Sequence, residues 1–358
     1  MPGPSSWRER RSPDGRTVRN EGQATVDAAG RTPRPLWRRL ATWVAGPVLA
    51  GLTAVVGCRA AGVDGITPVP QLLAFLPWLL LPGAVALVVA GLARWRVGLL
   101  WSVVVLAVTC WFLQPYDATA DVVGSRGHAL DSFRVLTANV EFGNATEALI
   151  DTLEREKPDL VFVEECDHRC SSALAEELPR SVYPYRNVAE GFSAEGSAIL
   201  STFPLESTEG VEGRLAMPGA RAAIGGRSVA VQLAHPLPPI PGGIGDWRTE
   251  LGRLRDYAGT EQSRGRPLIL AGDFNASQDH AAFRAILGSG KLRDSAQLDG
   301  RSRTPSWPAA TAPPLGAQID HILVSRDFDA DRVRFLDLPN TDHRAVLVDL
   351  TLYGAGQS

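Results

Sequence analysis

The first third of the chain contains three long apolar runs separated by short polar segments. The runs cover residues 40–58, 72–93 and 97–113, and none of them contains a charged residue. A helix needs about 17–25 apolar residues to cross the hydrocarbon core of a bilayer. The pattern therefore predicts three transmembrane helices over residues 40–113.

Two other interpretations of these runs fit less well. Three charge-free helices in series are hard to bury inside a small soluble domain. A cleaved signal peptide would account for the first run only, and the segment that precedes this run is too long for a signal peptide. Pro47, Pro77 and Pro82 do not exclude membrane helices, because neighbouring groups can satisfy the carbonyls that a proline leaves free.

Basic residues flank the apolar runs unevenly. Residues 1–39 contain nine Arg against four acidic residues and are rich in Pro, Gly and Ser. A segment with so few apolar groups cannot form a core, so we predict a disordered basic tail. The loop at residues 94–96 carries two further Arg. Basic loops stay on the cytoplasmic side, so three spans that begin inside place everything after about residue 114 outside the membrane.

A polar tether over residues 114–132 leads to a region where short apolar strands alternate with amphipathic helices. Strands are predicted at residues 134–140, 159–163, 197–201, 228–234, 268–271, 318–325, 332–336 and 345–352. Helices are predicted at residues 147–156, 171–178, 247–262 and 280–287, with Thr146 and Asp246 as caps. This alternation indicates a mixed α and β domain over residues 133–353.

Polar side chains stand where six of these strands begin or end. They are Asn139, Glu165, His235, the pair Asp273 and Asn275, the pair Asp320 and His321, and the group Thr341, Asp342 and His343. In an extended backbone Asp273 and Asn275 would share a face, although Gly, Asp and Asn together are also typical of a turn. Six such ends predict that one rim of a sheet converges on a site.

The residue types in this set favour one kind of chemistry. Carboxylates and amides are hard oxygen ligands that suit Mg²⁺, with Mn²⁺ as a second choice. A His beside a carboxylate can donate or accept a proton near neutral pH. The formal net charge of −3 gives no general affinity for nucleic acid. The set therefore predicts attack of water on a phosphate ester or anhydride.

The order of these residues resembles the endonuclease/exonuclease/phosphatase superfamily, which has the DNase-I-like fold. The motifs are GDFN at residues 272–275, IDHI at 319–322 and TDH at 341–343. The resemblance implies an α+β fold with four layers, αββα, over residues 133–353. Two positions depart from the family pattern, because Glu164 stands where Gln is usual and Thr341 where Ser is usual.

The resemblance also implies a role for each residue. It implies Asn139, Glu165 and Asp342 as metal ligands, His235 and His343 as catalytic residues, Asp273 as the group that orients or activates water, Asn275 as a phosphate contact, and Asp320 as the residue that holds His343. Three membrane spans before such a domain resemble the actinobacterial teicoplanin-resistance membrane proteins of the VanJ type. That resemblance implies a phosphatase that acts outside the membrane on a lipid pyrophosphate, the undecaprenyl carrier of cell-wall synthesis.

Three other functions stay open from the sequence. They are a membrane-tethered nuclease, a sphingomyelinase-like phosphodiesterase and a non-catalytic envelope-binding module. The soluble part has no strong run of Arg or Lys, so nucleic acid is not the expected partner. The expected partners are the bilayer and a polyprenyl pyrophosphate.

Several residues outside the motifs have two interpretations each. Cys166 and Cys170 are four residues apart and form either a local disulfide or two free thiols. Trp307 either belongs to the core or lines the substrate pocket. Arg344 either binds a second phosphate or is a surface charge. We expect Glu164 to be solvated or to lie behind the ligands, and His321 to pack near its strand. His128, His168 and His280 lack a motif and are predicted on the surface.

Overall fold

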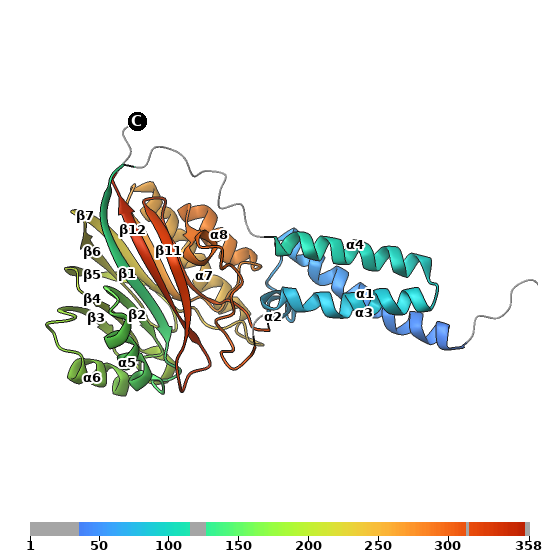
Figure 1. The fold of residues 1–358 in the computed structure, drawn as a ribbon, viewed down its shortest axis with the longest axis horizontal. Coiled ribbons are helices and arrows are strands. Elements are labelled where there is room, and N and C mark those ends of the chain that lie inside the picture. The colour runs from blue at the N-terminus through green and yellow to red at the C-terminus, as the bar shows by residue number, and fades with distance from the viewer. Residues whose placement is uncertain (1–35, 115–126, 313–314, 355–358) are drawn as a thin grey trace, which may run out of the picture.

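The computed structural model describes residues 36–114, 127–312 and 315–354, which form a helical part and a two-sheet part (Figure 1). Residues 1–35 of the predicted tail and residues 115–126 of the predicted tether lie outside this description. Residues 36–39 are already helical, and residues 129–132 open the first strand rather than extend the tether.

The helical part contains three long helices that lie side by side and extend away from the sheets (Figure 1). Its elements are α1 (Leu36–Ala61), α2 (Val69–Ala74), the 3-10 helix η1 (Leu76–Leu79), α3 (Leu80–Leu92) and α4 (Arg96–Leu113). By length and composition α1 and α4 could each cross a membrane, and 28% and 22% of their most apolar windows are buried. The rest of this apolar surface faces outward.

The middle predicted span is shorter than the sequence suggested. Its apolar helical stretch covers Leu76–Leu92 and falls below the length of the other two. Pro70 and Pro77 stand in the first turns of α2 and η1, where a missing N–H costs nothing. Because proline cannot continue a preceding helix, the run is divided into α2, η1 and α3. Two helices, not three, therefore meet the requirements for a membrane span in the described residues.

Two six-stranded sheets form the rest of the described structure. The first has the order β11-β12-β1-β2-β4-β3 and the second the order β5-β6-β7-β8-β10-β9. The strands of the first sheet are β1 (Ala129–Asn139), β2 (Leu160–Glu164), β3 (Tyr185–Ala189), β4 (Ser197–Ser201), β11 (Phe328–Asp337) and β12 (Arg344–Tyr353). Those of the second are β5 (Leu205–Val211), β6 (Met217–Ile224), β7 (Arg227–Ala234), β8 (Leu268–Asp273), β9 (Arg293–Asp294) and β10 (Asp320–Val324).

The sheets pack face to face, and helices cover their outer faces. In β1, Val135 contributes to the core between the sheets while the next residue, Leu136, packs outward with Leu149 of α5 (Thr146–Glu156). The helix α6 (His168–Glu177) lies on the same outer face. In the second sheet, α7 (Ile244–Ser263) and α8 (Ala281–Gly290) cover the outer face. The short α9 (Ser295–Leu298) completes the elements. Central strands are buried on both faces, which explains their continuous apolar runs.

All predicted strands and helices of this domain are present, but two predicted caps are wrong. Thr146 is the first residue of α5, follows the cap residue Ala145, and bonds the carbonyl of Gly143 through its hydroxyl. Asp246 lies inside the first turn of α7. The strands β3, β5, β6 and β9 and the helix α9 were not predicted. The observed architecture is the expected α+β sandwich of two sheets between helices.

Strand direction explains why the polar ends meet. In the first sheet β1 is parallel to β2 and antiparallel to β12, and in the second β7 is parallel to β8, which is antiparallel to β10. The carboxyl ends of each parallel pair therefore lie beside the amino end of an antiparallel neighbour. This arrangement gathers Asn139, Glu165, His235, Asp273, Asp320 and His343 at one edge of the sandwich.

Gly272 permits the close pairing of β7 and β8 at this edge. It has a φ of +147°, and a Cβ built on it would lie 2.0 Å from the carbonyl oxygen of Ala234. A side chain at residue 272 would therefore push apart the two strands that end in His235 and Asp273.

We predict that Gly272→Ala destabilises the protein by about 3 kcal/mol, because the added methyl overlaps backbone that cannot move aside. Gly288→Ala is a matched control, since Gly288 lies in α8 and its Cβ would meet nothing within 4 Å. Thermal unfolding of the purified variants measures both effects. Equal melting temperatures for Gly272→Ala and the wild type would refute the clash.

Candidate active site

Asn139, at the end of β1, connects two of the predicted carboxylates. Its side-chain Nδ2 donates to Oε1 of Glu165 at 3.1 Å and to Oδ2 of Asp273 at 3.2 Å. Its Oδ1 accepts the backbone N–H of Glu141 at 2.9 Å, so the amide is fixed at both ends. In this arrangement the nitrogen of Asn139 faces the carboxylates. Asn139 therefore orients two acidic groups from different sheets, and its predicted role as a metal ligand remains a prediction.

His343 and Asp320 form a buried pair at the amino ends of β12 and β10. Nδ1 of His343 lies 3.0 Å and 3.2 Å from the two carboxylate oxygens of Asp320. Burial alone lowers the pKa of His343, but the carboxylates of Asp320 and Asp273 outweigh it and raise this pKa to about 10. The imidazole therefore carries a proton at neutral pH, and Asp320 fixes its orientation.

Asp273 lies opposite Asp320 in the register of β8 and β10. Its Oδ2 is 3.8 Å from Nε2 of His343. Burial raises the pKa of Asp273 to about 7, and the nearby negative charge of Asp320 acts in the same direction. A carboxyl group with such a pKa can gain and lose a proton near neutral pH, as a general base requires.

His235, directly after β7, is almost fully buried, with 1% of its surface exposed. Its Nε2 is 3.8 Å from Oε1 of Glu165. Within the described residues neither of its ring nitrogens has a hydrogen-bond partner. Burial, followed by the positive charge of His343, lowers its pKa to about 3, so the ring is neutral. A buried polar group without a partner destabilises a protein by about 1–3 kcal/mol. Such a group is expected in a site where a bound ligand supplies the missing hydrogen bond.

Asn275 adopts the turn that the sequence left as an alternative. Its φ is +47°, so the shared face expected from an extended backbone does not form. Its N–H donates to Oδ1 of Asp273 at 2.8 Å, and its Nδ2 donates to the carbonyl of Pro236 at 3.0 Å. Asn275 thus orients Asp273 and holds the loop that follows His235. Its contact with phosphate remains a prediction.

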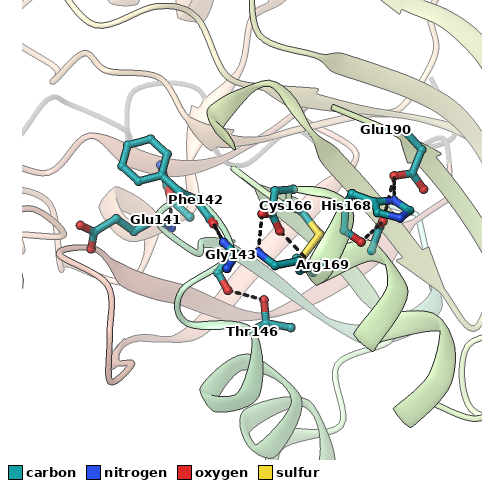
Figure 2. The surroundings of a disulfide bond; sticks show 12 residues. Glu141, Phe142, Gly143, Thr146, Cys166, His168, Arg169 and Glu190 are labelled. Atoms are coloured by element: carbon teal, nitrogen blue, oxygen red, sulfur yellow. Dashed lines mark hydrogen bonds and ion pairs between the residues drawn. A yellow bond between two sulfur atoms is a disulfide. The ribbon is translucent and has the colours of Figure 1, made fainter. Parts of the chain in front are cut away.

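A disulfide holds the segment that carries Glu165 (Figure 2). Cys166 and Cys170 are bonded, with Cα atoms 5.1 Å apart. Asp167 between them accepts the N–H of Cys170 at 3.0 Å and caps α6. Glu165 has a φ of +57°, and its Oε2 accepts the N–H of Phe142 at 3.0 Å. Burial raises the pKa of Glu165. The turn after β2 is therefore held by a disulfide that begins at the residue after Glu165, a predicted metal ligand.

Asp342 lies on the outer side of the site, with a side chain that is 48% exposed. Its Oδ1 is 3.6 Å from Nε2 of His343, and its Oδ2 accepts the indole N–H of Trp307 at 2.7 Å. Its backbone N–H donates to Oε2 of Glu141 at 2.8 Å. Trp307 is therefore part of the site, which favours the second of its two interpretations.

These residues fit a divalent cation. Asp273 and Asp320 offer carboxylate oxygens within 4.8 Å of each other, whereas the protonated imidazole of His343 does not serve as a ligand. Glu165 and Asp342 supply two more carboxylates, and the charge of Asp342 contributes to the raised pKa of Glu165. Buried carboxylates with raised pKa values repel one another, and a cation among their oxygens would relieve that repulsion. When bound, such an ion would stabilise negative charge on a phosphate oxygen.

Several neighbouring residues are structural. The guanidinium of Arg344 bonds Asp337 and the carbonyls of Pro305 and Ala309, so it is neither a surface charge nor directed at a ligand. His321 bonds Asp294 and packs on Phe283, as expected. Glu164 is fully buried rather than solvated, and burial raises its pKa well above the usual value.

His128 and His168 are exposed, whereas the prediction for His280 is wrong. His280 is fully buried. Its Nδ1 accepts the N–H of Ser277 at 2.9 Å, so its Nε2 carries the proton that it donates to the carbonyl of Pro70 at 2.8 Å. No local motif indicates this contact, because Pro70 lies 210 residues away.

The two-sheet fold is the type found in the endonuclease/exonuclease/phosphatase hydrolases. The model of the endonuclease/exonuclease/phosphatase family matches residues 136–343, and the chain belongs to this family, whose members are nucleases and phosphatases. A comparison with curated proteins gives no match.

Solved structures share the fold at low identity. The human Nocturnin catalytic domain with bound sulfate is 17% identical, with a TM-score of 0.50 over 63% of this chain and 96% of that one. The endonuclease/exonuclease/phosphatase from Beutenbergia cavernae is 18% identical, with a TM-score of 0.49 over 63% and 72%. The 3′-5′ exonuclease NExo from Neisseria meningitidis is 19% identical, with a TM-score of 0.49 over 60% and 98%.

We predict that Mg²⁺ at about 100 times its Kd stabilises the protein by about 2.7 kcal/mol, because it binds the folded site and not the unfolded chain. Glu165→Gln should lose most of this stabilisation, since a neutral amide replaces a buried carboxylate. Differential scanning calorimetry with and without Mg²⁺ measures the effect. Glu190→Gln is the control, because Glu190 is exposed and bonds Ser171 and His168. A Glu165→Gln response equal to that of the wild type would exclude Glu165 as a ligand.

Proposed function

We propose that this protein is a membrane-anchored, metal-dependent phosphohydrolase that acts outside the membrane on a lipid pyrophosphate such as undecaprenyl pyrophosphate. The family supplies the chemistry. The observation that supports a lipid substrate is the junction between the helical part and the sheets, which keeps the site close to the ends of the apolar helices.

A buried carboxylate forms the centre of this junction. Asp279, which is fully buried, lies 3.0 Å from Nε of Arg59 at the end of α1 and 3.0 Å from Nη2 of Arg303. Arg303 also donates to the carbonyl of Phe112 at the end of α4, at 2.8 Å. Removing one partner of a buried ion pair costs about 3–5 kcal/mol. The two parts therefore contact through a specific interface.

Further contacts surround this ion pair. Asp64, in the loop after α1, accepts the N–H of Ala282 at the start of α8 at 2.8 Å and is almost fully buried. His280 donates to the carbonyl of Pro70, as described above. A catalytic domain held in this way against membrane helices meets lipid-borne substrate at high effective concentration. A nuclease would gain nothing obvious from this placement.

Two observations support an extracytoplasmic catalytic domain. The beginning of α1, which includes Arg38 and Arg39, and the 94–96 loop between α3 and α4 lie at the ends of the helices that point away from the sheets (Figure 1), as a cytoplasmic location of these Arg residues requires. The disulfide between Cys166 and Cys170 is typical of an oxidising compartment. The active site would then face the outer leaflet, where a carrier pyrophosphate is released during cell-wall synthesis, and its recycling would give resistance to a glycopeptide such as teicoplanin.

The residues of the site have distinct roles in the proposed reaction. Asp273 accepts a proton from the attacking water, since its pKa of about 7 suits a general base. Asp320 orients His343, and the protonated imidazole stabilises charge on the scissile phosphate. The neutral ring of His235 offers an N–H to another phosphate oxygen. Glu165 and Asp342 would hold the cation.

We predict that the purified full-length protein in detergent with Mg²⁺ releases phosphate from undecaprenyl pyrophosphate and that EDTA abolishes the release. Asp273→Ala and His343→Ala should each lower kcat by about 10³-fold, because each removes a charge or proton acceptor that acts in the transition state. His128→Ala is the control, since His128 is exposed and outside the site. Cleavage of plasmid DNA without release from the lipid would replace the proposed substrate with nucleic acid.

We predict that alkaline phosphatase fused after residue 354 is active in cells and that green fluorescent protein at the same position is dark. Both results follow if the catalytic domain is outside the cytoplasm. Cys166 and Cys170 should then resist alkylation until a reductant is added, which peptide mapping would measure. A fluorescent fusion together with freely alkylated cysteines would reverse the proposed orientation.

A further inference from the structure

One short segment of the helical part contacts both loops that border the active site. This segment is α2 and η1 with Phe75 between them, residues 69–79. Gln71 donates through its side chain to the carbonyl of Pro239, in the loop that follows His235. Trp78 donates from its indole N–H to the carbonyl of Leu315 at 3.0 Å, in the loop that leads to Asp320. The segment therefore borders the site between these two loops.

Phe75 is connected to the site through a single aromatic ring. Its ring centroid lies 6.0 Å from that of Trp307, and both side chains are half-buried. The indole N–H of Trp307 donates to the carboxylate of Asp342. A predicted metal-binding carboxylate and an aromatic residue of the helical part thus contact the same indole.

The loop that carries Trp307 is fastened to the site. The N–H of Ala309 donates to the carbonyl of Asp342 at 2.7 Å, and the hydroxyl of Ser306 accepts the N–H groups of Ile319 and Asp320 at 3.0 Å and 3.1 Å. These bonds to residues of the site, together with the contact with Phe75, hold the indole of Trp307 in place.

Apolar side chains are exposed around this segment. Leu72 and Trp78 in the segment, Ile240 in one bordering loop and Leu315 in the other are between 36% and 56% exposed. Trp307 contacts both the carboxylate of Asp342 and the ring of Phe75, so it joins the polar site to this apolar surface. A substrate with a phosphate group joined to a hydrocarbon chain matches this combination, because burial of the apolar chain is favourable.

We propose that residues 69–79 are part of the substrate site, and that Phe75 and Trp307 hold the portion of a lipid chain adjacent to the phosphate. The inference rests on the proposed function, the hydrolysis of a lipid pyrophosphate, and it adds that the helical part selects the substrate by the length of its chain. The helices are then a binding element as well as an anchor.

The test compares kcat/KM for undecaprenyl pyrophosphate with kcat/KM for geranyl pyrophosphate, whose chain is short, using full-length protein in detergent. Phe75→Ala should lower the ratio of the two values about tenfold, through a higher KM for the long-chain substrate. Phe75→Leu, which keeps apolar volume, should recover part of the ratio and serves if the Ala variant does not fold. Trp307→Phe should lower kcat on both substrates, because it removes the bond to Asp342.

Val88→Ala is the matched control, since Val88 is an exposed apolar residue of α3 and should leave the ratio unchanged. If Phe75→Ala lowers kcat/KM equally for both substrates, Phe75 has only a structural role and the inference is overturned. An unchanged ratio, or a wild-type protein that is equally efficient on both substrates, would also overturn it while leaving the proposed hydrolysis intact. Failure of the wild type to hydrolyse either pyrophosphate would instead contradict the proposed function.

Discussion

The site depends on the pairing of strands of fixed direction in two sheets that share one core. Each sheet contributes a parallel pair and an antiparallel neighbour, so six polar strand ends lie at one edge. Neither sheet could hold the set alone. Asn139 from the first sheet bonds Asp273 from the second, and His343 from the first pairs with Asp320 from the second. The apolar packing between the sheets therefore determines the distances on which proton transfer depends.

The sequence predicted the central strands because they are buried on both faces and are therefore continuously apolar, as in β2 and β8. It did not predict β5, a partly exposed edge strand that contains Glu and Gly, or β6, which contains Pro, Gly and Arg. The polar strand ends were recognisable because each lies in a short local motif. Their partners were not, since the amide of Asn139 and the indole of Trp307 act across long separations in sequence.

The junction escaped prediction for a related physical reason. Asp279 and His280 look like ordinary surface residues after a turn, but both are fully buried and bond residues of the helical part. Composition indicated where the apolar helices lie. However, Pro70 and Pro77 divide the middle run, so that α2 and η1 lie beside the loops that follow His235 and precede Asp320. The break in the middle predicted span, between α2 and η1, thus allows Phe75 to contact Trp307.

The buried ion pair at Asp279 has a consequence for the order of assembly. The catalytic domain cannot complete its own surface, because the partner that neutralises Asp279 includes Arg59, some 220 residues earlier in the chain. The helices are synthesised first, so Arg59 and the loop around Asp64 are in place before α8 exists. The domain then folds onto a surface that is already present, and its final stability depends on that surface. The helical part thus offers a surface, formed earlier in the chain, onto which the buried carboxylate of Asp279 can pack.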